Sequence, residues 1–345
     1  TNEARGKAAV FCVIIGFGLQ ESGKKRLFEY EEVDGEPHEI VCEKINPYLA
    51  DAENVIISGV SKPLWDCPPM INGSKPADGG NLLLDEKEKQ ELIAAEKSAE
   101  KWIRPYSMGN EFINGIPRFC LWLKNCPPQE LRKMPLVMER VKAVKKFREK
   151  SPKKHTRDFA KTPAIFVEDR DVESPSLAIP RVSTANRAYI PIGYLSPDYV
   201  VGDTLYTVPN ATLYEFGVLT SLMHMSWMRA VCGRLESRYR YSARVVYNNF
   251  PWPQNPAKKQ TETIKTAAQA VLDARATYPD STLADLYDPI TMPAELLKAH
   301  QTLDTATDRA YRPAPFPNES TRVAHLFTLH QARTAPVVAK KKRGR

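Results

Sequence analysis

Residues 213–253 read LYEFGVLTSLMHMSWMRAVCGRLESRYRYSARVVYNNFPWP, and this stretch organises the rest of the chain. Apolar side chains recur in its first half at helical spacing, which predicts one buried amphipathic helix ending near Gly233. The apolar residues in question are Val218, Leu219, Leu222, Met223, Trp227, Ala230 and Val231. Pro251 and Pro253 lack the backbone donors that a helix or central strand needs. We therefore expect a domain to end directly after them.

The second half of the stretch mixes arginines with aromatic rings. Arg234, Arg238, Arg240 and Arg244 alternate with Tyr239, Tyr241 and Tyr247. This mixture is typical of a surface that binds a polyanion through cations and exposed rings. The alternative is a solvated basic strand with no ligand. As candidate phosphate contacts we take Arg238, Arg240 and Arg244.

The length, hydrophobic fraction and net charge of the chain limit the classes of protein to which it could belong. The chain has 345 residues, 42% of them hydrophobic, a net charge of +8 and a pI near 9.0. This length predicts two or three domains with sizeable cores, and the positive charge favours an acidic partner such as nucleic acid. No apolar run has membrane-spanning length and no signal peptide opens the sequence, so we expect a soluble intracellular protein that contacts no membrane.

Cysteine and histidine give no sign of a metal site. The six cysteines include no CxxC pair, and no histidine lies at ligand spacing from them. We predict neither bound metal nor disulfides. His224 falls inside the predicted apolar helix, where a hydrogen-bonded core residue is the expected role.

A second concentration of positive charge lies in the middle of the chain. Residues 129–150 are predicted to form a helix with Pro135 near its first turn, and residues 140–161 hold ten Lys or Arg against two acids. A solvated helix face explains such a run as well as DNA phosphate does. The candidate phosphate contacts here are Arg140, Lys142, Lys145, Lys146, Arg148, Lys153, Lys154 and Arg157.

Short β-branched or aromatic runs follow, at residues 164–168, 177–182, 188–192 and 204–208. Separated by Pro, Asp and Gly, they predict a mixed or antiparallel sheet. The polar connection between two of them would form a hairpin tip, and its side chains suit base edges, because Arg pairs with guanine and Asn with adenine. The candidate base-reading residues are Ser183, Thr184, Asn186 and Arg187. Alternatively, Asn186 only makes the turn and Arg187 pairs with an acid.

The remaining segments are predicted as follows. Residues 8–17 form a buried strand with residues 25–31 returning beside it, and residues 111–123 form a hairpin about Asn114-Gly115. Residues 86–102 are helical, and after Pro253 three apolar stripes predict a small helical unit that ends in an unstructured basic tail, KKKRGR.

Five long segments resemble one family in the family's own order. They are EARGKAAVFCVIIGFG (3–18), WIRPYSMGNEFINGIPRFCLWL (102–123), RVSTANRAYIPIGYL (181–195), FGVLTSLMHMSWMR through VYNNFPWP (216–253) and LADLYDPITMPAELLKAHQTLD (283–304). They resemble MmeI-like DNA methyltransferases, single-chain restriction-modification enzymes that methylate adenine N6. The resemblance covers nearly the whole chain. It implies the carboxy-terminal part of such an enzyme, in a prokaryotic cytoplasm.

The resemblance also implies what the chain lacks. Enzymes of this kind hold the extruded adenine with an Asn/Asp/Ser-Pro-Pro-Tyr/Phe loop. Cys67-Pro68-Pro69-Met70 and Cys126-Pro127-Pro128-Gln129 have the prolines without the polar and aromatic residues, and Gly16-Phe17-Gly18 lacks the rest of a nucleotide loop. We therefore expect no catalytic residues and no cofactor in this chain. The parent enzyme would use S-adenosylmethionine on its upstream methyltransferase domain.

These observations predict an α+β fold with a mixed or antiparallel sheet. The expected divisions are the end of a methyltransferase domain (1–60), a linker (61–84), a target-recognition domain (85–254), a helical domain (255–335) and a disordered tail (336–345). The expected function is sequence-specific recognition of double-stranded DNA. We expect the chain to have no methyltransferase activity without the upstream methyltransferase domain. The alternative is a stand-alone specificity subunit or an inactive prophage remnant. An RNA-binding protein would need an aromatic RRM strand or a GXXG loop, and neither occurs.

Overall fold

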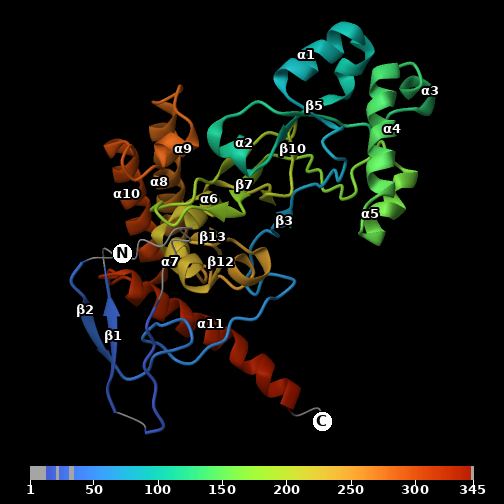
Figure 1. The fold of residues 1–345 in the computed structure, drawn as a ribbon. Coiled ribbons are helices and arrows are strands. Elements are labelled where there is room, and N and C mark those ends of the chain that lie inside the picture. The colour runs from blue at the N-terminus through green and yellow to red at the C-terminus, as the bar shows by residue number, and fades with distance from the viewer. Residues whose placement is uncertain (1–12, 21–22, 31–34, 343–345) are drawn as a thin grey trace.

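The computed structural model describes residues 13–20, 23–30 and 35–342, with side chains as far as residue 335. The described chain forms a lobe around the sheet β10-β5-β6-β4 and a larger body around the sheet β3-β11-β7-β9 and the C-terminal helices. Figure 1 shows α4 and α5 on the far side of the molecule from α8, α9 and α10. Among the described residues, no helix is long and apolar enough to cross a membrane.

The amino-terminal part holds an antiparallel hairpin of β1 (Lys25–Glu29) and β2 (His38–Cys42), with Lys25 opposite Cys42. We predicted that β1 would pair with residues 8–17 instead. Residues 8–12 lie outside the described chain, and residues 13–17 form no strand and expose Ile14 and Phe17 almost completely. An apolar run is stable as an inner strand only where both faces are covered, and the described residues supply no such cover.

The smaller lobe packs helices on a short mixed sheet in which β10 is parallel to β5 and the other pairs are antiparallel. Its core is built from apolar side chains of β4, β6 and α4, including Leu84, Leu121 and Val144. The elements are β4 (Leu83–Leu84), α1 (Glu86–Ala95), the 3-10 helix η1 (Lys97–Trp102), β5 (Ile103–Ser107), α2 (Gly109–Asn114), β6 (Phe119–Leu121), α3 (Pro128–Leu131), α4 (Pro135–Glu149), α5 (Lys154–Asp158), the 3-10 helix η2 (Phe159–Lys161) and β10 (Val200–Val201).

Local signals explain where these helices begin and end. Asp85 and Glu88 form a capping box at the start of α1, and the buried Glu96 carboxylate accepts from the amides of Leu136 and Val137 at the start of α4. The helix predicted over residues 129–150 is therefore two helices, because α4 has its own cap. The hairpin predicted at Asn114-Gly115 is wrong.

Gly115 closes α2 in a left-handed conformation, with φ of 62°. The same Asn-Gly dipeptide that favours a tight hairpin turn also favours the end of a helix, since both need positive φ.

The larger body is built on the antiparallel sheet β3-β11-β7-β9. Its strands are β3 (Ile71–Asn72), β7 (Ser176–Pro180), β9 (Gly193–Leu195) and β11 (Leu205–Pro209). The segment 61–84, which we predict to be a linker, contributes β3 to this sheet and β4 to the other. Of the predicted strands, residues 164–168 form only a bridge from Lys75 to Glu168, and residues 188–192 form no strand.

The helix predicted from residue 213 to Gly233 is two helices, α6 (Leu213–Thr220) and α7 (Leu222–Val231). Ser221 between them is extended, with φ of −82° and ψ of 160°. Its hydroxyl donates to the Val218 carbonyl, and the Asp304 carboxylate accepts from the Leu222 amide at 2.6 Å. Hydroxyl groups that bond to nearby carbonyls, together with a cap supplied by a distant residue, break a helix whose apolar spacing is continuous.

The C-terminal helices pack on α6 and α7, except for α9, which contacts α2 of the smaller lobe. They are α8 (Lys258–Ala276), α9 (Leu283–Leu286), α10 (Ala294–Tyr311) and α11 (Glu319–Lys342), preceded by the π-helix η3 (Ala243–Tyr247). The tail predicted to be unstructured from residue 336 is helical as far as Lys342. Helix α11 also covers the early segment 48–65, where Tyr48 stacks on Phe327 and the Arg333 guanidinium donates to the Leu64 carbonyl.

The two bodies meet between α2 and α9 and where Gly73 passes Gly202. The Ser74 amide donates to the Val201 carbonyl at 2.6 Å, and the Gly202 amide donates to the Ser107 carbonyl. A Cβ atom added to Gly73 would lie 2.1 Å from the Gly202 carbonyl oxygen. Only glycine allows two backbones to approach this closely, so the junction depends on that residue.

Candidate nucleic-acid interface

A third, small sheet brings together two groups of residues that lie far apart in sequence. It contains β12 (Gly233–Leu235), β13 (Arg238–Arg240) and β8 (Val182–Ser183), in the order β12-β13-β8. Both pairings are antiparallel, with Tyr239 opposite Ser183 and Arg240 opposite Val182. The candidate base-reading residues that follow β8 therefore begin beside the arginines of β13.

Side chains of β13 alternate between the protein core and the solvent. Arg238 and Arg240 are exposed, whereas Tyr239 is buried, and Tyr241 just beyond the strand is buried as well. Residues that alternate along a strand face opposite sides. The prediction of exposed rings among exposed arginines is therefore wrong for these tyrosines. Tyr247 is buried too and donates to the Pro68 carbonyl at 2.6 Å.

The buried tyrosine rings anchor the strand that carries the exposed arginines to the protein core. The Tyr241 hydroxyl lies 3.0 Å from His224 Nε2, and His224 Nδ1 lies 2.9 Å from the Leu219 carbonyl. Burial lowers the pKa of His224 to about 4, so this histidine is neutral at physiological pH. His224 is thus the hydrogen-bonded core residue that we predicted, and it lies behind the small sheet.

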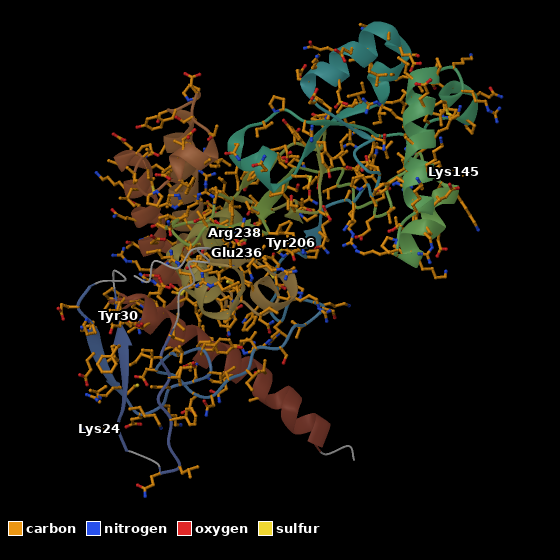
Figure 2. All side chains as sticks on the ribbon, in the orientation of Figure 1. Lys24, Tyr30, Lys145, Tyr206, Glu236 and Arg238 are labelled. Carbon is orange, nitrogen blue, oxygen red and sulfur yellow. The ribbon has the colours of Figure 1, made fainter. Side chains whose placement is uncertain are left out.

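The tip of the β12–β13 hairpin carries an acid–base pair. Glu236 has φ of 56°, a left-handed conformation that costs a non-glycine residue about 1 kcal/mol. Its carboxylate lies 2.7 Å from the Arg238 guanidinium, and Figure 2 shows the two side chains close together. The Arg234 guanidinium lies 3.8 Å from the centre of the Tyr239 ring. Sequence reasoning missed this hairpin, since Glu-Ser lacks the Gly or Asn that usually marks such a turn.

The stretch from Ser183 to Arg187 is not the tip of a simple hairpin. Strand β7 pairs with β9, and the chain between them leaves their sheet to pair through β8 with β13. Ser183 is buried, and no described residue bonds to its hydroxyl. Thr184 is half-buried and Asn186 is exposed. Arg187 is half-buried, and burial lowers the pKa of its guanidinium while the Asp288 carboxylate opposes that shift.

A basic face runs along α4 and α5 on the smaller lobe. Six of the eight candidates predicted there are exposed, namely Lys142, Lys145, Lys146, Lys153, Lys154 and Arg157. Lys145 lies 3.9 Å from Glu149, and Lys154 lies 2.9 Å from Asp158. Arg140 is partly buried and pairs with Glu88 at 2.9 Å. Such exposed pairs are weak, so these lysines remain available to an anion.

Arg148 does not belong to this face. Its side chain is fully buried, and its guanidinium donates to five backbone carbonyls, those of Pro76, Ala77, Phe159, Thr162 and Ile165. All five of its N–H groups are used. The prediction that Arg148 contacts phosphate is wrong, because charge counting along a sequence does not show which face of a helix points inward.

The structure therefore brings together two of the three predicted groups and leaves the third apart. Ser183, the first residue of the stretch 183–187, lies beside the β13 arginines, and Arg244 is exposed in η3. Lys145 on α4 is well separated from Glu236 and Arg238 (Figure 2). A ligand that met both surfaces would have to be long.

Comparisons with known proteins first give the class. The family model described as the MmeI target recognition domain matches residues 51–254, and that of the MmeI C-terminal domain matches residues 255–338. These matches define a target recognition domain followed by a C-terminal domain. The chain belongs to the MmeI family, as its sequence resemblance predicted.

Two relatives support this assignment. "DNA methyltransferase A" of Bacillus subtilis (strain 168) is 39% identical over 334 residues, which are 96% of this chain and 37% of that protein. The structure of the type IIL restriction-modification enzyme MmeI in complex with DNA is 48% identical, with a TM-score of 0.89 over 97% of this chain and 45% of that one. The likeness confirms the α+β fold class. The chain spans less than half the length of either relative.

Proposed function

We propose that this chain recognises a specific sequence in double-stranded DNA on behalf of an adenine-N6 DNA methyltransferase of the restriction-modification type. The observation that carries the proposal is the small sheet. It sets the start of the polar stretch 183–187 beside Arg238 and Arg240, whose neighbours Tyr239 and Tyr241 are buried. The MmeI relative was solved in complex with DNA, which supports DNA as the partner.

We assign the candidate residues to two kinds of DNA contact. Contacts to phosphate fix the register of a protein on the duplex, and contacts to base edges select the sequence. The exposed lysines of α4 and α5, with Arg238, Arg240 and Arg244, suit phosphates. Asn186 and Arg187 carry the side chains that bind adenine and guanine edges in the major groove. Thr184, half-buried just after β8, is a further proposed base contact, whereas the buried Ser183 is not available to a base.

The chemistry would belong to a methyltransferase domain outside this chain. In such an enzyme, S-adenosylmethionine supplies the methyl group, and the target adenine leaves the helical stack to reach it. The part proposed for this chain is to hold the duplex in one register while that happens. DNA as the partner would place the protein in the bacterial cytoplasm.

The test compares substitutions in the two groups. Lys146→Ala should weaken binding equally on all sequences and reduce the salt slope by roughly one unit, because one phosphate contact is lost. Arg187→Ala should cost about 1–3 kcal/mol on the selected site and much less on random duplex. The measurement is a binding titration on both duplexes at several salt concentrations. The selected site comes from sequencing duplexes that the chain enriches from a random pool.

Lys87→Ala is the matched control for charge, since Lys87 is exposed on α1 beside Glu91 and outside both proposed surfaces. It should leave the salt slope unchanged. If the chain enriches no sequence from the pool, the proposal of sequence-specific recognition fails. If Arg187→Ala weakens binding equally on both duplexes, Arg187 is a phosphate contact and does not read a base.

A further inference from the structure

The proposed base-reading stretch has little structure of its own. Within residues 184–187, the described part of the chain shows one long hydrogen bond, which the Asn186 amide donates to the Thr184 hydroxyl at 3.5 Å. The preceding residue, Ser183, is fixed by the pairing of β8 with β13. The position of Asn186 and Arg187 therefore depends on what holds the chain directly after them.

That downstream end is held by Arg229, in the last turn of α7. The Arg229 guanidinium donates to the Ala188 carbonyl at 2.8 Å and to the Glu319 carboxylate at 2.6 Å. Glu319 is the first residue of α11, within the segment that matches the C-terminal domain. One side chain thus joins the end of the stretch to the C-terminal domain.

The next residues are attached to the same domain. The Tyr189 hydroxyl donates to Asp304 at 2.7 Å, and its ring stacks on His300 with centroids 4.0 Å apart. Arg275 of α8 donates to the Ile192 carbonyl at 2.7 Å. Two helices of the C-terminal domain, α8 and α10, therefore contact the chain between residues 188 and 192 directly, and α11 reaches it through Arg229.

We propose that the C-terminal domain is a specificity element, and that Arg229 is the positioning residue through which it sets the place of Asn186 and Arg187. This inference rests on the proposed function. Base contacts need side chains held to within about half an ångström, so a loosened Ala188 would weaken the reading of bases. Phosphate contacts elsewhere on the surface would be unaffected.

The experiment uses the 345-residue chain and selection from a random duplex pool. Arg229→Gln removes the charge and at least one of the two bonds. Base preference at one or more positions should fall about five-fold or more, while affinity for the unselected pool changes less than about two-fold. Glu319→Gln should shift the same positions less, because Arg229 keeps its bond to Ala188. Arg229→Lys should recover part of the preference.

Arg333→Gln is the matched control. Arg333 lies on α11 and also donates to a carbonyl, that of Leu64, far in sequence from residues 184–192. It should keep the base preferences of the wild type. Trypsin digestion of the free chain gives a readout without DNA, and cleavage after Arg187 should be faster in Arg229→Gln and Glu319→Gln but not in Arg333→Gln.

Three results would overturn the inference. The first is unchanged base preference in Arg229→Gln and Glu319→Gln, and the second is an unchanged rate of tryptic cleavage after Arg187. The third is an equal loss on selected and unselected duplexes, which would make Arg229 a phosphate contact. A wild-type chain that enriches no sequence would instead remove the proposed function, and this inference with it.

Discussion

Arg148 shows how a charged residue can serve the fold alone. The five carbonyls that it binds belong to two separated segments, residues 76–77 and 159–165. Burial lowers the pKa of its guanidinium, and the Asp78 carboxylate opposes that shift. Through these hydrogen bonds the side chain joins the end of α4 to both segments.

Replacement of Arg148 should therefore affect stability rather than DNA binding. Arg148→Met would leave five buried carbonyls without donors and should lower the free energy of unfolding by about 3 kcal/mol or more. Urea denaturation measures this loss. Lys146→Ala, two residues away on the exposed face, should stay within about 0.5 kcal/mol of the wild type. Equal stability of the two variants would mean that water replaces the guanidinium without cost.

Asp304 gives a prediction about pH. Its carboxylate accepts from Tyr189 and from the Leu222 amide, and burial raises its pKa from 3.8 to about 6, with nearby Asp308 raising it further. The folded state therefore binds this proton more tightly than the unfolded state does. The resulting stabilisation is complete below pH 3.8 and is lost as the pH rises through 6.

Asp304→Asn removes that titration. Between pH 4 and pH 7, the wild type should lose up to about 3 kcal/mol of unfolding free energy relative to the variant. Urea denaturation at several pH values measures the difference, and the buried histidines, which titrate in both proteins, cancel from it. Parallel pH profiles would contradict the assignment. The asparagine side chain of the variant has one acceptor oxygen where Asp304 has two, so the variant should also be less stable at every pH. The test therefore compares the shapes of the two pH profiles.

At the scale of elements, the sequence predicted which segments are helical better than it predicted where each helix begins and ends. The helical content of 86–102, 129–150 and 213–233 is present, although the first segment is α1 followed by the 3-10 helix η1. The second and third segments are likewise each two helices. Their breaks depend on side chains distant in sequence, the Glu96 carboxylate at α4 and the Asp304 carboxylate at α7. Periodicity reports which face is apolar and carries no information about a cap that arrives from another element.

The junction between the two sheets gives the prediction at this scale. Gly73→Ala would place a Cβ atom 2.1 Å from the Gly202 carbonyl oxygen, a backbone atom that cannot rotate away. We expect a loss of about 2 kcal/mol or more in unfolding free energy. Thermal unfolding measures it. Gly233→Ala is the control, because its Cβ would meet nothing within 4 Å, and a similar loss there would remove close packing as the cause.

At the scale of the whole molecule, the family could be recognised from five ordered segments, whereas the site could not be assembled from them. Both Tyr239 and Arg240 look like ligand-binding residues in sequence, yet the pairing of β13 with β8 turns one inward and the other outward. That pairing joins residues 182–183 to residues 239–240, and no local pattern specifies it. The basic segment 140–161 was equally ambiguous, because only the fold separates Arg148 from Lys146.

The cover that α11 gives to residues 48–65 has a consequence during protein synthesis. Val55, Ile57 and Trp65 are buried in the finished protein, and Trp65 packs against His330 of that last helix. A ribosome adds roughly 5–20 residues per second, so the early apolar segment waits on the order of tens of seconds for its partner. During that interval it is exposed to aggregation and to chaperones. A segment that is buried in the folded chain is therefore exposed to solvent for much of its synthesis.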